Sequence, residues 1–128
     1  MMNWLRKIFR LEPQPKKYRL LPEQIKPLAI GFGGCIATDM ITVHGKKVGY
    51  MVREKTTRPD DSGWCFTSGE ESQEYMDNPE NHGIYDLNTI ANCCPDIIEH
   101  LDAPPLSAFI RDKETGKLVI IEYEQPLQ

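Results

Sequence analysis

The stretch from Asp60 to Asn92 constrains the fold of this 128-residue chain most, because it gathers helix signals between two groups of strand signals. It opens with turn residues, and the alternating pattern of Trp64–Thr67 then predicts a short strand. Ser68 and Glu71 have the spacing of a capping box, which predicts a helix that starts there and runs to about Met76. Helices are therefore expected in the middle of the chain rather than between successive strands.

Two further short helices are predicted in this region. Asp86 is a suitable N-cap for a helix over Leu87–Asn92. Pro95 suits the first turn of a third helix, and Pro104-Pro105 ends it.

Apolar runs before this segment predict strands. Leu28–Thr38 contains a glycine cluster without the spacing of a phosphate-binding loop, so a strand with a bulge or a close backbone approach is expected. Ile41–Val43 and Val48–Val52 flank His44-Gly45, a pattern that predicts a hairpin.

The end of the chain predicts another hairpin. Leu106–Arg111 and Leu118–Tyr123 are its expected strands, and Gly116 is the expected left-handed residue of the turn. Strands on both sides of a helical middle segment predict an α+β fold with a mostly antiparallel sheet.

The first 27 residues have a composition of their own. Met1–Leu11 places apolar residues at helical spacing opposite basic ones, which predicts an amphipathic helix. That helix would pack on the body or, as the alternative, contact a membrane surface, for which it is short. The proline-rich Glu12–Pro27 is expected to be an extended linker. Residues 1–27 are thus a predicted basic head, and residues 28–128 a single predicted domain.

The sequence predicts a cytoplasmic protein. No run approaches the roughly 18 apolar residues of a membrane-spanning helix, and the N-terminus lacks the pattern of a secretory signal. None of the four cysteines has C-x-x-C spacing, so free buried thiols are expected. A redox-active pair at Cys93-Cys94 is the alternative.

Charge is distributed unevenly along the chain. From Pro59 to Ile110 there are eleven carboxylates and no Lys or Arg. Residues 1–19 carry a net charge of +5, so the remainder carries −9. An acidic body would repel phosphate, which argues against nucleic acid as a partner and favours a basic protein.

Signals for catalysis are weak. His44, His82 and His100 are scattered and lack metal-binding spacing. An acid–base pair of Glu70 and Asp86, or a divalent cation among Asp60, Asp61 and Asp86, remains open but has no sequence signature. We therefore predict no cofactor and no enzymatic activity.

The acidic segment is the predicted partner-binding surface, because aromatic residues alternate there with carboxylates as they do in tight interfaces. A solvated acidic face without function is the alternative, and Trp64 also fits a core position. The candidate residues are Asp60, Asp61, Trp64, Glu70, Glu71, Glu74, Tyr75, Asp77, Tyr85 and Asp86.

The stretch DSGWCFTSGEESQEYMDNPENHGIYDLNTIA, with KKVGYMVRE before it and SAFIRD after it, resembles the immunity protein 33 family. The likeness covers about Cys35–Lys117. These are small bacterial α+β proteins found beside polymorphic toxin systems. The resemblance implies that the chain binds and neutralises a cognate toxin, and it implies no particular binding residues.

Two hypotheses follow. The first is a non-enzymatic immunity-type protein whose acidic segment occludes a basic toxin. The second is an uncharacterised cytoplasmic domain with a ligand or metal pocket, conceivably enzymatic. The sequence leaves the oligomeric state open.

Overall fold

A computed structural model describes residues 15–124. The predicted helix at Met1–Leu11 lies outside these residues. The elements in chain order are η1 (Pro22–Gln24), β1 (Gly34–Thr38), α2 (Asp39–Thr42), β2 (Tyr50–Arg53), β3 (Asp61–Thr67), α3 (Gln73–Asp77), η2 (Pro79–Asn81), β4 (His82–Asp86), α4 (Leu87–Cys93), η3 (Pro95–His100), β5 (Ser107–Arg111) and β6 (Leu118–Ile121), where η marks a 3₁₀-helix.

One six-stranded sheet in the order β4-β1-β3-β2-β5-β6 organises the chain. Four of the neighbouring pairs are antiparallel, and β1 with β3 is parallel. The α+β fold with a mostly antiparallel sheet is therefore confirmed. The parallel pair arises because β1 and β3 are not consecutive, and the chain between them first builds α2 and β2.

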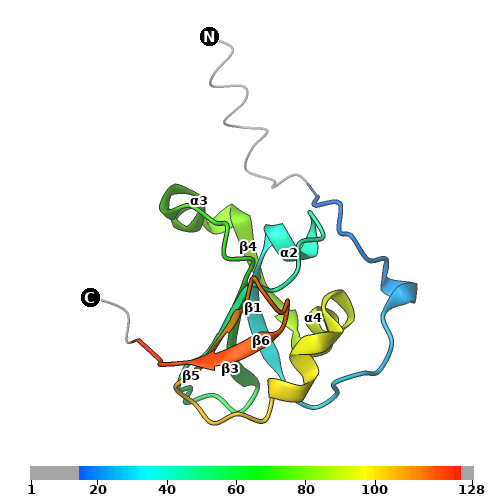
Figure 1. Cartoon of the computed structure of the whole chain (residues 1–128). Coiled ribbons are helices and arrows are strands. Elements are labelled where there is room, and N and C mark those ends of the chain that lie inside the picture. The colour runs from blue at the N-terminus through cyan, green and yellow to red at the C-terminus, as the bar shows by residue number, and fades with distance from the viewer. Residues whose placement is uncertain (1–14, 125–128) are drawn as a thin grey trace.

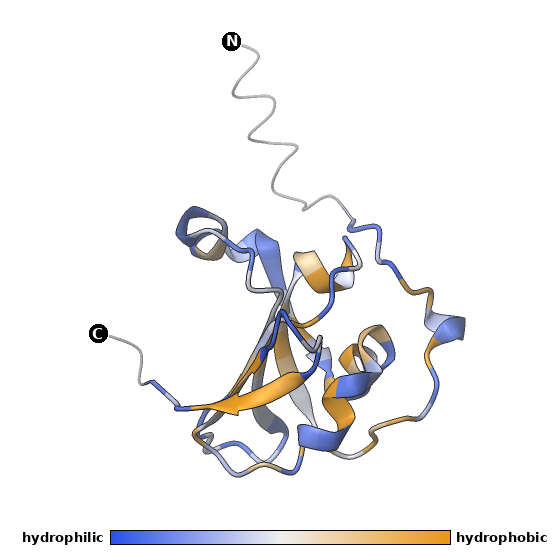
Figure 2. Ribbon diagram, viewed as in Figure 1, coloured by the Kyte–Doolittle hydropathy of each residue, from blue (hydrophilic) through white to orange (hydrophobic). Residues whose placement is uncertain are grey.

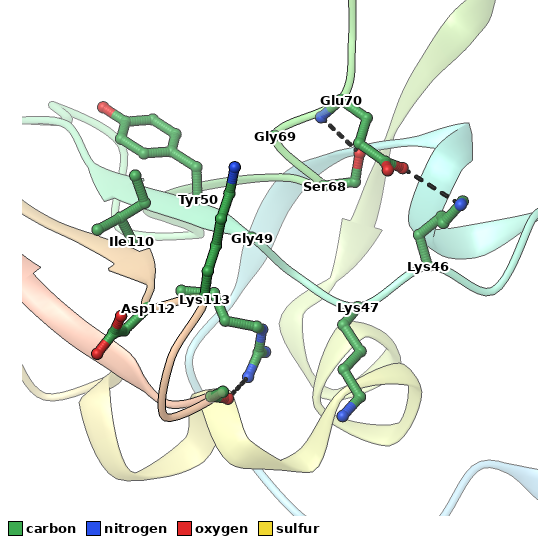
Figure 3. Close-up of a pocket in the computed structure, with 12 residues that line it drawn as sticks. Lys46, Lys47, Gly49, Tyr50, Ser68, Gly69, Glu70, Ile110, Asp112 and Lys113 are labelled. Carbon is green, nitrogen blue, oxygen red and sulfur yellow. Dashed lines mark hydrogen bonds and ion pairs between the residues drawn. The ribbon is translucent and has the colours of Figure 1, made fainter.

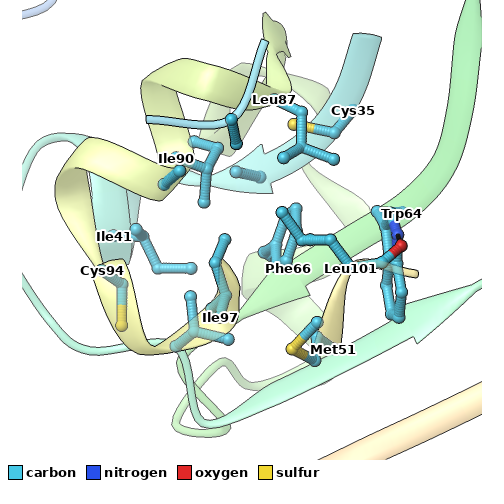
Figure 4. Packing of buried hydrophobic residues seen from close by; sticks show 14 of the residues in the cluster. Cys35, Ile41, Met51, Trp64, Phe66, Leu87, Ile90, Cys94, Ile97 and Leu101 are labelled. Atoms are coloured by element: carbon cyan, nitrogen blue, oxygen red, sulfur yellow. Dashed lines mark hydrogen bonds between the residues drawn. The ribbon is translucent and has the colours of Figure 1, made fainter. Parts of the chain in front are cut away.

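Helices cover one face of the sheet. α2 and α4 lie on the same side of it (Figure 1), and the apolar residues of both helices are buried there. The core between the sheet and these helices contains Trp64 and Phe66 of β3, whose rings stack with centroids 6.1 Å apart (Figure 4). Alternation along β3 sends both rings to the covered face, as the sequence predicts.

The glycine cluster makes the close backbone approach that was predicted. Gly33 has φ +90°, and a Cβ there would lie 2.5 Å from the Asp60 carbonyl oxygen. The next residue, Gly34, donates its N–H to the same carbonyl at 2.8 Å. The register between β1 and β3 also shifts between Gly34 and Ile36, which is the predicted irregularity.

The predicted hairpin around His44-Gly45 is wrong. Asp39–Thr42 forms the helix α2 instead, and β2 pairs with β3 and β5. The Asp39 carbonyl accepts N–H groups from Val43 and His44, and Gly45 at φ +72° then turns the chain out of the helix. The glycine is thus a helix-end residue rather than a hairpin residue.

The predicted helix start at Ser68 is also wrong. α3 begins at Gln73, with the Ser72 hydroxyl accepting the Tyr75 N–H at 3.0 Å. Gly69 has φ +89°, which no right-handed helix contains, so the chain turns before the helix begins. The sequence offers no prediction for His82–Asp86, and this segment forms the edge strand β4 beside β1.

Other local predictions are confirmed. Asp86 caps α4 by accepting the Asn88 N–H at 2.9 Å, and Pro95 opens η3. The final hairpin joins β5 to β6, with Gly116 at φ +74°. No helix within residues 15–124 has the length and apolarity to cross a bilayer.

The segment before β1 is fastened to the body. The Asn88 side chain accepts the N–H groups of Leu28 and Ala29 and donates to the Lys26 carbonyl. Asn92 donates to the same carbonyl at 2.8 Å. Two amide side chains on one face of α4 therefore hold the end of the proline-rich stretch.

Candidate functional site

The uncovered face of the sheet exposes isoleucines in adjacent strands. Ile36 of β1 is the register partner of Ile84 of β4 and of Cys65 of β3. Ile84 is 81% exposed and Ile36 is 44% exposed, although Cys35 and Ala37, the neighbours of Ile36 in β1, are buried. Strand alternation explains the difference, because only every second residue faces the helices.

Three of the predicted carboxylates lie near Gly34, which is two residues before Ile36 in β1. Gly34 is the register partner of Asp61 on one side and of Asp86 on the other, so these two residues flank β1. Asp60 precedes Asp61 and is held by the backbone bond to Gly34. Ile36, Ile84, Asp60, Asp61 and Asp86 together are called the acid-rimmed patch below.

A hollow of about 350 Å³ lies over this end of the sheet. Its lining includes the apolar Ile36, Ile84 and Cys65, the carboxylates of Asp60 and Asp61, and the cations Lys55 and Arg58. Arg58 lies 3.3 Å from Asp60, and both side chains are more than 70% exposed. A pair this exposed contributes little to stability and separates readily when a partner approaches.

A second acidic group lies at the opposite end of β4. Glu74 and Asp77 are exposed on α3, and Glu80 is exposed on η2, which leads into His82. The five residues of β4 separate this group from Asp86 by about 13 Å of strand. The predicted site residues therefore form two groups rather than one continuous surface.

Glu71 reaches back to the Ser68 N–H as the predicted capping box requires, although it does so in a loop and not at a helix start. Its carboxylate accepts hydrogen bonds from the Thr38 hydroxyl, from the N–H and hydroxyl of Ser68, and from the Gly69 N–H. Burial raises the pKa of the Glu71 carboxyl, but these donors outweigh it and the pKa lies below the ordinary value. Glu71 thus ties the loop after β3 to the end of β1.

The predicted aromatic residues differ in accessibility. Trp64 is 1% exposed and its indole N–H donates to the Leu101 carbonyl at 3.2 Å, so it offers no surface to a partner in this structure. Tyr85 is half-buried against Tyr18, with the ring centroids 6.0 Å apart. Tyr75 on α3 is also half-buried.

The acidic segment contains no Lys or Arg of its own, but cations from elsewhere in the chain neutralise part of it. Cations from outside the segment pair with it in space: Lys46 with Glu70 at 3.3 Å, and Arg111 with Asp96 at 2.6 Å. Arg111 holds the pKa of the Asp96 carboxyl below its usual value. Sequence distance hid these pairs, because β2 and β5 bring both cations to the segment only in the folded chain.

A cleft of about 500 Å³ was not predicted (Figure 3). Lys46, Lys47 and Lys113 line it together with Glu70, between the loops before β2, after β3 and after β5. The adjacent lysines after Gly45 were its only sequence signal. Its cations could attract an anion, but two of them, Lys46 and Arg111, already form ion pairs with Glu70 and Asp96.

The cysteines are free thiols. Burial raises the pKa of Cys65 to about 11 and that of Cys94 to about 11, and it also raises the pKa of Cys93. Thiolate is the reactive form of cysteine, so these environments oppose redox chemistry at Cys93-Cys94 near neutral pH.

The candidate metal and acid–base groups do not come together. Among residues 15–124, no three His, Cys, Asp or Glu side chains converge in a way that could hold a metal ion. Asp61 and Asp86 instead accept backbone N–H groups of Gly63 and Asn88. Of the suggested acid–base pair, Glu70 pairs with Lys46 at the cleft, whereas Asp86 caps α4.

Comparison with known proteins gives one match. The model of a family described as the immunity protein Imm33 domain matches residues 35–122. This range contains all of the sheet except Gly34, the first residue of β1, and both acidic groups. Neither the curated proteins nor the solved structures contain a match to the chain.

Proposed function

Since this chain belongs to the Imm33 family of immunity proteins, we propose that it binds and neutralises a cognate bacterial toxin in the cytoplasm, without catalysing a reaction itself. Neutralisation by binding requires a surface that remains accessible in the folded chain. It also requires apolar anchors, because a few buried contacts provide most of the affinity of a protein interface.

The acid-rimmed patch is the proposed docking surface. Ile84 carries this proposal, because an isoleucine that is 81% exposed gains nothing from the fold and would gain most from a partner. Ile36 is its register partner in β1. Asp60, Asp61 and Asp86 lie around Gly34, two residues along β1 from Ile36. An apolar centre with a charged border is the usual anatomy of a protein interface.

The proposed toxin surface is basic. The chain has a net charge of −4, and the carboxylates of the patch are poised to pair with Lys or Arg of the partner. Glu74 and Asp77 at the other end of β4, together with Glu70 in the loop before α3, would extend the negative field and speed encounter. Tyr75 would lie at the border of the contact.

The test is a pair of lysine substitutions at two exposed isoleucines on opposite edge strands. The chain is co-expressed with a toxin encoded beside its gene, and growth and the dissociation constant are measured. Ile84→Lys should weaken binding about thirtyfold, as expected when an interface anchor is lost, and abolish protection. Ile120→Lys, at a site that is 70% exposed on β6, should leave both unchanged. Equal binding by the Ile84→Lys variant would exclude the acid-rimmed patch.

Charge reversal tests the electrostatic part separately. Glu70→Lys combined with Glu74→Lys should lower the association rate and reduce its dependence on salt, with a smaller effect on dissociation. An unchanged association rate would remove the second acidic group from the proposal without affecting the patch.

A further inference from the structure

The outer edge of β6 carries unpaired backbone groups. Asp112 N–H donates to the Lys117 carbonyl across the last hairpin, whereas Arg111 N–H points the other way, to Gly49 beside β2. Because hydrogen-bonded pairs alternate in antiparallel strands, Val119 and Ile121 must also bond to β5. The N–H and C=O groups of Leu118, Ile120 and Glu122 therefore point outward, and no other strand in residues 15–124 pairs with them.

This edge lacks the features that usually keep edge strands apart. β6 reads Leu-Val-Ile-Ile, with no charge, proline or bulge inside it. Val119 is 41% exposed, Ile120 70% and Ile121 37%, so both faces of the strand are apolar at the edge. Figure 2 shows β6 as a continuous hydrophobic ribbon at the border of the sheet.

The ends of β6 are oppositely charged. Lys117 precedes the strand, whereas Glu122 and Glu124 follow it, and all three are exposed. Antiparallel pairing of two copies would place each Lys117 near the glutamates of the other copy, whereas parallel pairing would bring like charges together. The edge is thus complementary to itself in one orientation.

Backbone geometry selects the same arrangement. In an antiparallel pair, partners lie on the same face and bonded partners both point outward. A two-fold axis at Ile120 meets both conditions: Ile120 pairs with Ile120 of the second copy, Leu118 with Glu122, and Val119 with Ile121. Each of the three outward-facing pairs would form two backbone hydrogen bonds, and the exposed side chains of both edges would meet.

We propose that β6 is a self-association edge, at which a second copy of this chain adds its own β6 in antiparallel register centred on Ile120. The opposite edge is less suited to this role. β4 is continuous with η2 at one end and with α4 at the other, and its last residue is the exposed, charged Asp86, so an incoming strand could not extend past either end of it. The β6 contact leaves the acid-rimmed patch, at the β4 edge, accessible for toxin.

The first test is sedimentation of the full chain over a range of concentrations. The wild-type chain should show a monomer–dimer equilibrium. Ile120→Pro should weaken it about thirtyfold, because it removes one outward-facing donor from each copy while leaving the bonds to β5 in place. Ile84→Lys on β4 should dimerise like the wild type. A wild-type chain that stays monomeric at high concentration, or unchanged dimerisation of a folded Ile120→Pro variant, would overturn the proposal.

Two further variants test orientation and register. Lys117→Glu should weaken the dimer, and adding Glu122→Lys should restore it. Ile120→Cys should form an intermolecular disulfide under mild oxidation, since paired Cα atoms lie about 5.5 Å apart. Val119→Cys should not, because its counterpart would be a diagonal neighbour about 7–8 Å away. Cross-linking by Val119→Cys but not by Ile120→Cys would refute the register. Toxin binding by the Ile120→Pro variant separates this proposal from the proposed function, because the two sites are independent.

Discussion

Replacing Glu71 by Gln tests whether this carboxylate holds the fold together rather than contacting a partner. One carboxylate oxygen accepts the Ser68 N–H at 2.8 Å and the Thr38 hydroxyl, and the other accepts the Gly69 N–H and the Ser68 hydroxyl, both at 2.9 Å. The hydroxyls can rotate to find another acceptor. The two N–H groups are fixed, so either orientation of a Gln side chain leaves one of them facing an NH₂ group.

The expected loss of stability follows from the one backbone N–H that Glu71→Gln leaves without an acceptor. One charge-assisted bond to a backbone N–H is lost, and bonds of this kind contribute about 1.5–3 kcal/mol. We therefore expect Glu71→Gln to lower the free energy of unfolding at pH 7 by about 2 kcal/mol. For a chain of this length, that corresponds to a decrease in melting temperature of about 8 °C.

The pH dependence provides a second signature. The Glu71 pKa is lower in the folded chain than its ordinary value of 4.5, so its contribution is complete above that value. The contribution is lost as the pH falls through the folded pKa, because the carboxyl is then protonated in both states. The stability difference between the wild type and Glu71→Gln should accordingly shrink below about pH 4.5.

Urea unfolding followed by tryptophan fluorescence, to which the buried Trp64 contributes, measures both effects at pH 7 and at pH 3.5. Glu74→Gln is the matched control, because this side chain is exposed on α3 and should change stability by less than about 0.5 kcal/mol. If Glu71→Gln were as stable as Glu74→Gln at pH 7, or if its deficit did not change with pH, the structural role of Glu71 would be refuted.

Three other predictions concern local contacts. Asp96→Asn should destabilise the chain by about 1 kcal/mol in thermal melts at pH 7, because it weakens the bond to Arg111, and a variant as stable as the wild type would contradict this. Since that bond lowers the Asp96 pKa, the stabilisation should be lost as the pH falls through the lowered value. Gly49→Ala should cost about 3 kcal/mol in urea unfolding, because the added Cβ would lie 1.9 Å from the Ser68 carbonyl oxygen; a small cost would mean that the two loops separate easily. Cys65, with a pKa of about 11, should react slowly with a thiol reagent at pH 7.5 in the folded chain and rapidly in guanidinium, and fast reaction of the folded chain would contradict the raised pKa.

Local chemistry predicted those parts of the fold that depend on a few neighbouring residues. Asp86 as a cap, Pro95 in a first turn and Gly116 in a hairpin are each determined within about four positions. Gly45 shows the limit of this reasoning. A glycine after an apolar run fits a hairpin turn and a helix end equally well, and only the bonds to the Asp39 carbonyl decide between them.

The functional residues were harder to predict, because tertiary contacts assign their roles. By sequence, Glu71 belongs both to the predicted capping box and to the predicted acidic surface, and the bond from Thr38 of β1 that ties it to the sheet could not be predicted from local spacing. Ile84 had no signal as an exposed residue, because β4 itself was not predicted. Its exposure follows from the position of β4 at the sheet edge and from the absence of a helix over that face in the described part of the chain.

Carboxylate footprinting of the toxin complex tests the central claim most directly. The chain is labelled with a carbodiimide and an amine, alone and with bound toxin, and each carboxylate is quantified by mass spectrometry. Shielding of Asp60, Asp61 and Asp86, with unchanged labelling of Glu114 in the exposed hairpin turn, is the predicted result. Shielding of Glu114 together with unchanged labelling of the three aspartates would place the toxin elsewhere and contradict the account.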